Sequence, residues 1–251
     1  MPHDGPVHRI EYDLLVNWTK RLAREGPFFL DLFRARGVRR VLDLACGTGR
    51  HAALFSDAGI EVVALDASDD MIHRARENFG ALPIRFVTAD MRQVASLFEK
   101  AGFDACVCLG NALPCVDNPD QAARLIDDVA DLLRPGGVFV IHMLNFNRWT
   151  ADRRIEGPRL ADHPDRTVLF LKVFEPAGAR LRVSILQLEK RADWELTADK
   201  GDLTVIPPDA VLEAVRRARL PVAGAYEDHT KTPFKAVSSD NLILVAEKPA
   251  T

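Results

Sequence analysis

Asp43, Gly47 and Gly49 are spaced so that together they could bind a charged small molecule. Asp43 lies within a short apolar run, 41–45, and the two glycines lie between this run and a helical pattern that begins near Arg50, which is the order strand, tight turn, helix. Glycines in such a turn let a ligand approach the backbone without meeting a Cβ. The N–H groups at the helix start favour an anionic group, but a carboxylate at position 43 would repel a pyrophosphate. Asp43 therefore favours a ligand that carries a cationic group.

Two further acids, Asp66 and Asp90, come at or soon after the ends of apolar runs. Asp66 follows the run 60–65, and a carboxylate at the tip of a second strand can accept hydrogen bonds from two ribose hydroxyls. Asp90 follows the run 84–87 and is also a suitable N-cap for the next helix. A nucleoside-containing ligand would suit this series of strand-end acids.

The elements that must position these acids alternate between apolar strands and amphipathic helices. This alternation predicts a parallel sheet with helices on both faces and right-handed crossovers. The expected strands cover 41–45, 60–65, 84–87, 103–109 and 138–143, and the helices between them begin near residues 50, 68, 91 and 118.

The alternation is absent at the two ends of this core. Residues 11–36 have a helical pattern that we expect to break at Gly26-Pro27, and the alternating stretches 166–174 and 180–190 predict a hairpin. Further elements are expected as a strand at 194–205, a helix from 207, and a last antiparallel pair of strands at 222–226 and 241–246. We therefore expect an N-terminal helical lid over 1–36, an α/β domain over 37–144 and 206–251, and a β-rich insertion over 145–205 above the acceptor pocket.

The string Asp43-Leu-Ala-Cys-Gly-Thr-Gly-Arg-His51 resembles the first motif of the class I S-adenosylmethionine-dependent methyltransferases. The resemblance covers residues 39–144 motif by motif and the rest by element order. It implies a Rossmann-like α/β fold with a doubly wound, mostly parallel seven-stranded sheet. It also implies S-adenosylmethionine as cofactor, whose sulfonium and ammonium groups agree with the preference of Asp43.

The resemblance implies a role for particular residues. Asp90 would hold the adenine amino group and Met91 would line the ring, while Tyr12 and Trp18 belong either to a lid over the cofactor or to the core. No metal site is expected. The implied cofactor contacts are Tyr12, Trp18, Asp43, Ala45, Gly47, Thr48, Gly49, Arg50, Asp66, Ala67, Met71, Asp90, Met91, Leu109 and Gly110.

A second pair of motifs is similar to the glycine/sarcosine N-methyltransferase-like branch, which acts on small molecules. These motifs are Leu109-Gly110-Asn111 and His142-x-x-Asn145-Phe146-Asn147. In glycine methyltransferases an arginine directly before that Asn holds the substrate carboxylate, but Leu144 takes this place here. Asn111 and His142 follow the fourth strand and end the fifth, which makes them the candidate catalytic residues; His142 could be a base or a histidine hydrogen-bonded in the core.

The composition of the chain limits its possible binding partners and its location in the cell. The formal net charge is −3 without a basic run, which disfavours a nucleic-acid substrate. No apolar run has the length of a membrane span and no signal-peptide core is visible, which predicts a cytoplasmic protein without a membrane partner. The four cysteines lack metal or redox spacing and are expected to be small buried groups in a reducing cytosol.

The expected function is methyl transfer from S-adenosylmethionine to a small-molecule acceptor, expected to be an amine, by in-line displacement. Two alternatives stay open: a non-catalytic S-adenosylmethionine-binding module, and an NAD-type oxidoreductase. Gly47-x-Gly49-x-x-Ala52 matches a loose dinucleotide fingerprint, but Asp43 and the absence of an evident hydride-transfer site disfavour the oxidoreductase. The pattern selects neither the acceptor, the methylated atom nor an oligomeric state.

Overall fold

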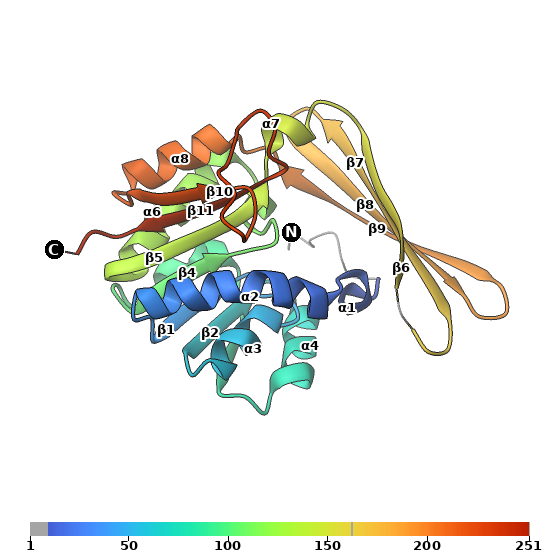
Figure 1. The fold of residues 1–251 in the computed structure, drawn as a ribbon, viewed down its shortest axis with the longest axis horizontal. Coiled ribbons are helices and arrows are strands. Elements are labelled where there is room, and N and C mark those ends of the chain that lie inside the picture. The colour runs from blue at the N-terminus through green and yellow to red at the C-terminus, as the bar shows by residue number, and fades with distance from the viewer. Residues whose placement is uncertain (1–9, 162, 251) are drawn as a thin grey trace.

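The computed structural model describes residues 10–161 and 163–250, which form two sheets with helices packed on the larger one (Figure 1). The larger sheet has seven strands in the order β10-β11-β5-β4-β1-β2-β3. Strands β1 to β5 run parallel, and β11 is antiparallel to both β5 and β10. The predicted doubly wound, mostly parallel seven-stranded sheet is therefore confirmed. Its strands are β1 (Arg40–Leu44), β2 (Glu61–Asp66), β3 (Ile84–Thr88), β4 (Phe103–Cys108), β5 (Leu133–Leu144), β10 (Val222–Tyr226) and β11 (Asn241–Glu247).

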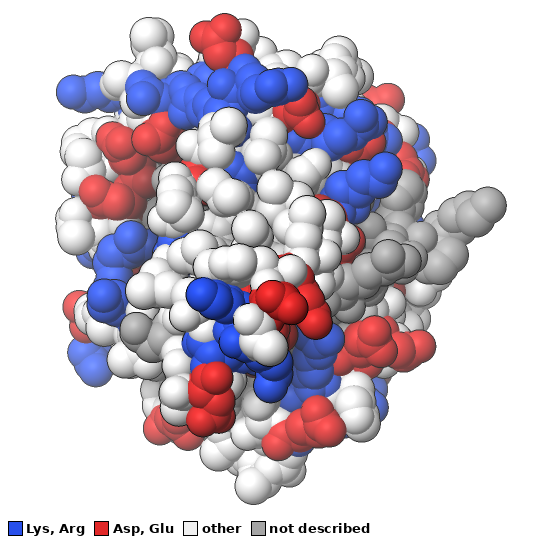
Figure 2. All heavy atoms as spheres, turned by 90° about the vertical axis from the view of Figure 1, so that its right-hand side faces the viewer, with Lys and Arg blue, Asp and Glu red and all other residues white. Residues whose placement is uncertain are grey.

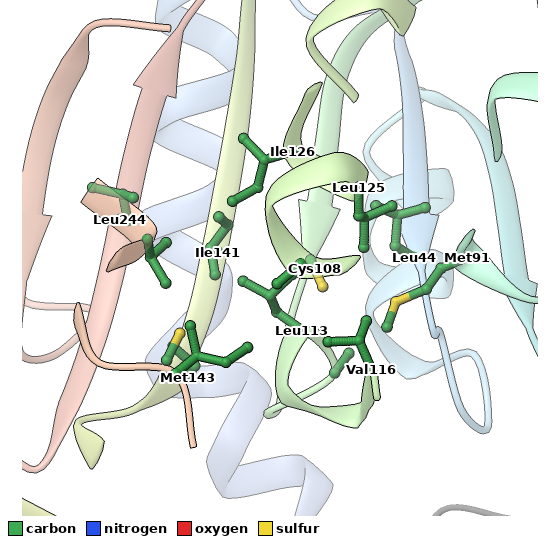
Figure 3. Packing of buried hydrophobic residues seen from close by; sticks show 14 of the residues in the cluster. Leu44, Met91, Cys108, Leu113, Val116, Leu125, Ile126, Ile141, Met143 and Leu244 are labelled. Carbon is green, nitrogen blue, oxygen red and sulfur yellow. The ribbon is translucent and has the colours of Figure 1, made fainter. Parts of the chain in front are cut away.

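Each face of this sheet has its own apolar core, because successive strand residues point to opposite faces. Figure 3 shows one face, where Leu125 and Ile126 of helix α6 pack near Leu44 and Ile141 of the sheet. On the other face Val41 packs with aromatic residues of α2 and α3. The strands that carry the predicted acids are thus fixed on both sides. The helices are α1 (Tyr12–Leu15), α2 (Trp18–Ala35), α3 (Arg50–Asp57), α4 (Asp69–Phe79), α5 (Val94–Leu97), α6 (Pro119–Leu132), α7 (Phe146–Trp149) and α8 (Pro208–Arg217).

The N-terminal segment corrects one prediction, because α2 continues through Gly26-Pro27. The break lies earlier, between α1 and α2, where the side chain of Asn17 accepts a backbone N–H and caps α2. A proline inside a helix costs about 3 kcal/mol. On the following turns Phe29 and Phe33 are fully buried, with ring centroids 5.7 and 5.1 Å from Phe55 of α3. We attribute the continuous helix to this aromatic packing, which offsets the local cost of the proline. The predicted lid residues 1–9 lie outside the described residues.

Two other boundaries also differ from the prediction. Strand β5 begins at Leu133 rather than 138, because Gly136 and Gly137 exchange backbone hydrogen bonds with Lys248 near the end of the chain. The helix expected over 91–100 is a 3₁₀ turn, Met91–Gln93, followed by the single turn of α5. Pairing with a distant segment thus sets the start of β5, and no local sequence pattern indicates such pairing.

The second sheet is antiparallel and has four strands in the order β6-β7-β8-β9. It contains the predicted hairpin, which turns at Gly178, and the predicted third strand. Strand β6 was not predicted, because its Gly157-Pro158 pair interrupts any apolar alternation and shifts its register against β7. Figure 1 shows this sheet on the side of the molecule where α1 and α7 lie. Its strands are β6 (Arg154–Ala161), β7 (Thr167–Ala177), β8 (Arg180–Lys190) and β9 (Trp194–Thr204).

The side of the molecule that carries the second sheet has a mixed surface. Figure 2 shows basic and acidic side chains interspersed across it. In the part of the chain that the structure describes, no helix is long and apolar enough to cross a membrane.

Candidate functional site

An open pocket, about 1190 Å³ with the adjoining solvent space included, lies at the carboxyl ends of β1, β2 and β4. This is where doubly wound sheets bind their ligands. It brings together many of the predicted residues: Tyr12, Trp18, Asp43, Ala45, Gly47, Asp66, Ala67, Met71, Asp90, Met91, Leu109, Gly110 and Asn111. It also contains residues that the sequence did not single out: Arg21, Cys46, His51, Leu65, Ser68, Arg92, Ala112 and Cys115.

The turn between β1 and α3 forms the base of this pocket. Gly47 and Gly49 have φ of 56° and 79°, in the left-handed region that favours glycine. A Cβ on Gly49 would lie 3.0 Å from Phe86 and 3.1 Å from Ala75, so this glycine is needed for packing. Gly49 does not line the pocket, whereas Gly47 does. The two glycines of the motif thus have different structural tasks.

Thr48 and Arg50 also lie outside the pocket, which differs from the predicted direct contact. The Thr48 hydroxyl donates to Oδ1 of Asp13 at 2.7 Å, and the Arg50 guanidinium donates to Oδ2 of the same residue at 3.1 Å. Asp13 belongs to α1, the short helix that also carries Tyr12. These two motif residues therefore hold the N-terminal segment against the turn.

Asp43 is the most unusual charged group of the pocket. It is 2% exposed, and its Oδ2 has no hydrogen-bond partner. Burial, reinforced by the nearby carboxylate of Asp66, raises the pKa of Asp43 to about 8. A cationic group placed beside Asp43 would restore its ionised form, so the site is electrostatically suited to a cation.

Asp66 and Asp90 are held at the ends of their strands by backbone N–H groups. Asp66 Oδ2 accepts from Gly47 N at 2.8 Å, and its Oδ1 accepts from Ser68 N at 2.9 Å. Asp90 caps the 3₁₀ turn through Oδ1, as predicted, and its carboxylate also pairs with the guanidinium of Arg92. Both acids are therefore oriented before any ligand binds.

The N-terminal helices close one side of the pocket. Tyr12 and Trp18 meet edge to face at 6.1 Å, and the guanidinium of Arg21 lies 5.0 Å from the Trp18 ring. The Trp18 ring also meets His51 edge to face at 5.7 Å. The helical spacing of Arg21, one turn after Trp18, could have indicated it; His51 had no signal beyond its place after the first motif.

His51 is held by a buried carboxylate. Its Nε2 lies 2.9 Å from Glu25 Oε2, and Glu25 is 1% exposed. Burial lowers the pKa of His51, against the bond to Glu25, which raises it. Burial would raise the pKa of Glu25, but the hydrogen bond of His51 and the charge of Arg21 together bring it well below its usual range. The pocket wall thus contains a neutral imidazole backed by a carboxylate.

The two predicted catalytic residues are adjacent, but only Asn111 lines the pocket. Asn111 N donates to the carbonyl of His142 at 3.1 Å, and Asn111 Oδ1 accepts from Leu144 N at 2.6 Å. His142 does not line the pocket, and the centroid of its ring lies 5.2 Å from that of the His229 ring. Burial lowers the pKa of His142 to about 3. Asn111 is thus hydrogen-bonded to the end of β5, whereas His142, the other candidate catalytic residue, does not line this pocket.

Comparisons with known proteins concern the class of domain and its fold. The sequence profile of the family described as "Methyltransferase domain" matches residues 41–137. The glycine/sarcosine N-methyltransferase of Aphanothece halophytica is 32% identical over 139 residues, which are 55% of this chain and 52% of that protein. The chain thus spans about half the length of this curated relative.

Solved structures extend the fold similarity to nearly the whole chain. S-adenosylmethionine-bound CalS10, an amino pentose methyltransferase from Micromonospora echinaspora, has a TM-score of 0.76 at 22% identity and covers 98% of this chain and 100% of its own. The sugar N-methyltransferase KedS8 from Streptoalloteichus has a TM-score of 0.74 at 24% identity and covers 98% and 95%.

Fold and profile together confirm the predicted class. The chain contains, over residues 41–137, a class I S-adenosylmethionine-dependent methyltransferase domain. S-adenosylmethionine is the cofactor of this class of domain.

Proposed function

We propose that this protein transfers the methyl group of S-adenosylmethionine to the nitrogen of a small-molecule amine. The observation that carries the proposal is the buried, unpartnered carboxylate oxygen of Asp43 beside Gly47. In the proposed complex the amino acid end of the cofactor lies there, Asp66 accepts from the ribose hydroxyls, and Asp90 with Met91 holds the adenine. Asp43 and the turn would orient the sulfonium, and a closed pocket would exclude water from an in-line displacement.

An amine acceptor must reach the methyl group without its proton. His51 is the histidine of the pocket wall, and its lowered pKa keeps it neutral at physiological pH and so able to accept a proton. Asn111 would shape the same end of the pocket from the loop after β4. According to their names, the similar proteins methylate glycine, sarcosine or sugars that include an amino pentose. These names support nitrogen as the atom that accepts the methyl group.

The second sheet is proposed to cover the acceptor end, as an insertion over 145–205. Arg159 of β6 donates to the carbonyls of Leu14 and Leu15 in α1. From β8, Arg180 donates to the carbonyl of Asp117, and the Asp117 carboxylate bonds Arg92 of the pocket at 2.7 Å. These contacts connect the sheet to both sides of the pocket mouth and support the proposed division into lid, α/β domain and insertion.

The remaining partner assignments belong to the same proposal. Interspersed charges on the face of Figure 2 support a small molecule rather than a nucleic acid as substrate. The four cysteines are free thiols, Cys106 and Cys108 fully buried and the other two partly so, which supports the proposed cytoplasmic location.

We expect S-adenosylhomocysteine to bind and NAD not to bind. The reason is that Asp43 favours the ammonium group of the former and would repel the pyrophosphate of the latter. Isothermal titration with both ligands checks this result, and release of S-adenosylhomocysteine after addition of S-adenosylmethionine and an amine separates an enzyme from a binding module. Tight binding of NAD, together with no heat of binding from S-adenosylhomocysteine, would favour the oxidoreductase over the methyltransferase.

Glycine is expected to be a poor acceptor compared with bulkier and less acidic amines. Leu144 stands where a carboxylate-binding arginine would be needed, and loss of a buried charge-assisted pair costs on the order of 2–5 kcal/mol. Steady-state assays with glycine, sarcosine, larger amines and amino sugars measure this preference. A kcat/KM for glycine at or above that of the other acceptors contradicts the argument.

A further inference from the structure

A second cluster of chemically active side chains lies behind the pocket wall. Glu25 of α2, His142 of β5 and His229 of the loop after β10 each offer one metal-ligating atom, and these atoms lie within 4.8 Å of one another. Glu25 is 1% and His229 is 7% exposed. The three residues come from segments far apart in the chain, so no motif with a fixed spacing predicts that they lie together.

Both imidazoles have a ring nitrogen that the surrounding protein does not satisfy. Nδ1 of His142 and Nε2 of His229 are buried without a hydrogen-bond partner. Such groups are rare in native proteins and call for a specific explanation, such as an ion or a water molecule. An imidazole binds a metal ion through a ring nitrogen that carries no proton, and each of these two rings has such a nitrogen to offer.

We propose that Glu25, His142 and His229 form a binding site for one divalent transition-metal ion, with Zn²⁺ as the preferred ion. Two neutral imidazoles and one carboxylate are a known three-ligand set for zinc, which leaves a fourth position for water. Because the three ligand atoms lie no more than 4.8 Å apart, an ion placed between them would be at most about 2.8 Å from each. Each ligand atom would have to move toward the ion by less than about 1 Å to reach zinc–ligand distances of 2.0–2.2 Å.

The surroundings of the cluster resemble those of bound metals. Glu25 is oriented by His51 at 2.9 Å and by Arg21 at 3.0 Å, and a carboxylate has enough lone pairs to accept both and still bind an ion. The His229 ring packs edge to face against Phe28 at 5.4 Å, which keeps bulk water away. The ion would fasten α2, which carries Trp18 of the pocket, to β5 and the loop after β10.

The test is metal binding by the chelator-treated full chain, with Zn²⁺ and Co²⁺ as probes. We expect one ion per chain, a rise of the melting temperature with Zn²⁺, and an intense visible Co²⁺ spectrum of a four-coordinate site. His229→Gln, His142→Gln and Glu25→Gln should each weaken Zn²⁺ binding by at least about 100-fold, since even outer contacts of a metal site contribute 10- to 100-fold.

His73→Gln is the matched control, because this exposed histidine lies 3.2 Å from Glu77 on the surface of α4. It should leave the ion count and the affinity unchanged. Retention of wild-type affinity by His229→Gln, with loss in His73→Gln, would show surface binding and overturn the proposal. Absence of Co²⁺ binding by the wild-type chain at 1:1 stoichiometry would also overturn it, whether or not the variants fold.

Discussion

Asp43→Asn is expected to weaken cofactor binding strongly while making the ligand-free protein more stable. The loss of a buried charge pair costs about 2–5 kcal/mol, which corresponds to roughly 30- to 5000-fold in the dissociation constant of S-adenosylhomocysteine. The gain in stability arises because the pKa of Asp43 is raised to about 8 in the folded protein, so burial of this carboxyl opposes folding at neutral pH. Asparagine has no carboxyl group and lacks this cost. Titration calorimetry and urea unfolding of the same variant measure the two effects.

The pH dependence of that gain follows from the direction of the shift. The unfolded chain releases the Asp43 proton near its ordinary pKa of 3.8, whereas the folded chain keeps it up to about 8. Stability of the natural protein therefore falls as pH rises between these values, by about 1.4 kcal/mol per unit for this group. The asparagine variant lacks this loss, so its advantage should grow from pH 5 to pH 8. An advantage that is constant across this range contradicts a raised pKa.

Cofactor binding should also release a proton from Asp43. At pH 7 the free protein holds this carboxyl mainly in its neutral form, and a cation beside it favours the ionised form. Calorimetry in buffers of different ionisation enthalpy should show release of close to one proton at pH 7. In Asp43→Glu, the charge-preserving control, some affinity and proton release should remain. Binding without proton release would place the cation away from Asp43.

Asp66→Ala is expected to weaken S-adenosylhomocysteine binding roughly 10- to 100-fold. A hydrogen bond to a charged group contributes about 1.5–3 kcal/mol, and about 1.4 kcal/mol is tenfold. The structure adds a second effect, because Asp66 also accepts from the backbone of Gly47 and Ser68 and so holds the turn.

Asp66→Asn separates the two effects, since the amide oxygen can keep one backbone bond while the charge is lost. We expect it to bind more tightly than the alanine variant and less tightly than the natural protein, as measured by calorimetry. Circular dichroism and thermal unfolding establish that both variants are folded. An unchanged dissociation constant in a folded alanine variant would make Asp66 a residue of the turn alone.

The sequence by itself determined the class of the fold and the base of the pocket. Strand, turn and helix alternate with local periods, and a strand-end acid is carried to the carboxyl edge of a parallel sheet by strand direction alone. Asp43, Gly47, Asp66 and Asp90 could therefore be placed together from their positions in that alternation, and the structure has them lining one pocket.

Only the tertiary structure decided which groups complete that pocket. Helix α2 passes through Pro27 because its own buried aromatics pack against Phe55 of α3, and the helix brings Glu25 to His51 and to Arg21. His142 does not line the pocket and lies beside His229, eighty-seven residues later in the chain. Contacts between segments so far apart depend on how helices and strands pack, and packing leaves no period or spacing in the sequence from which they could be predicted.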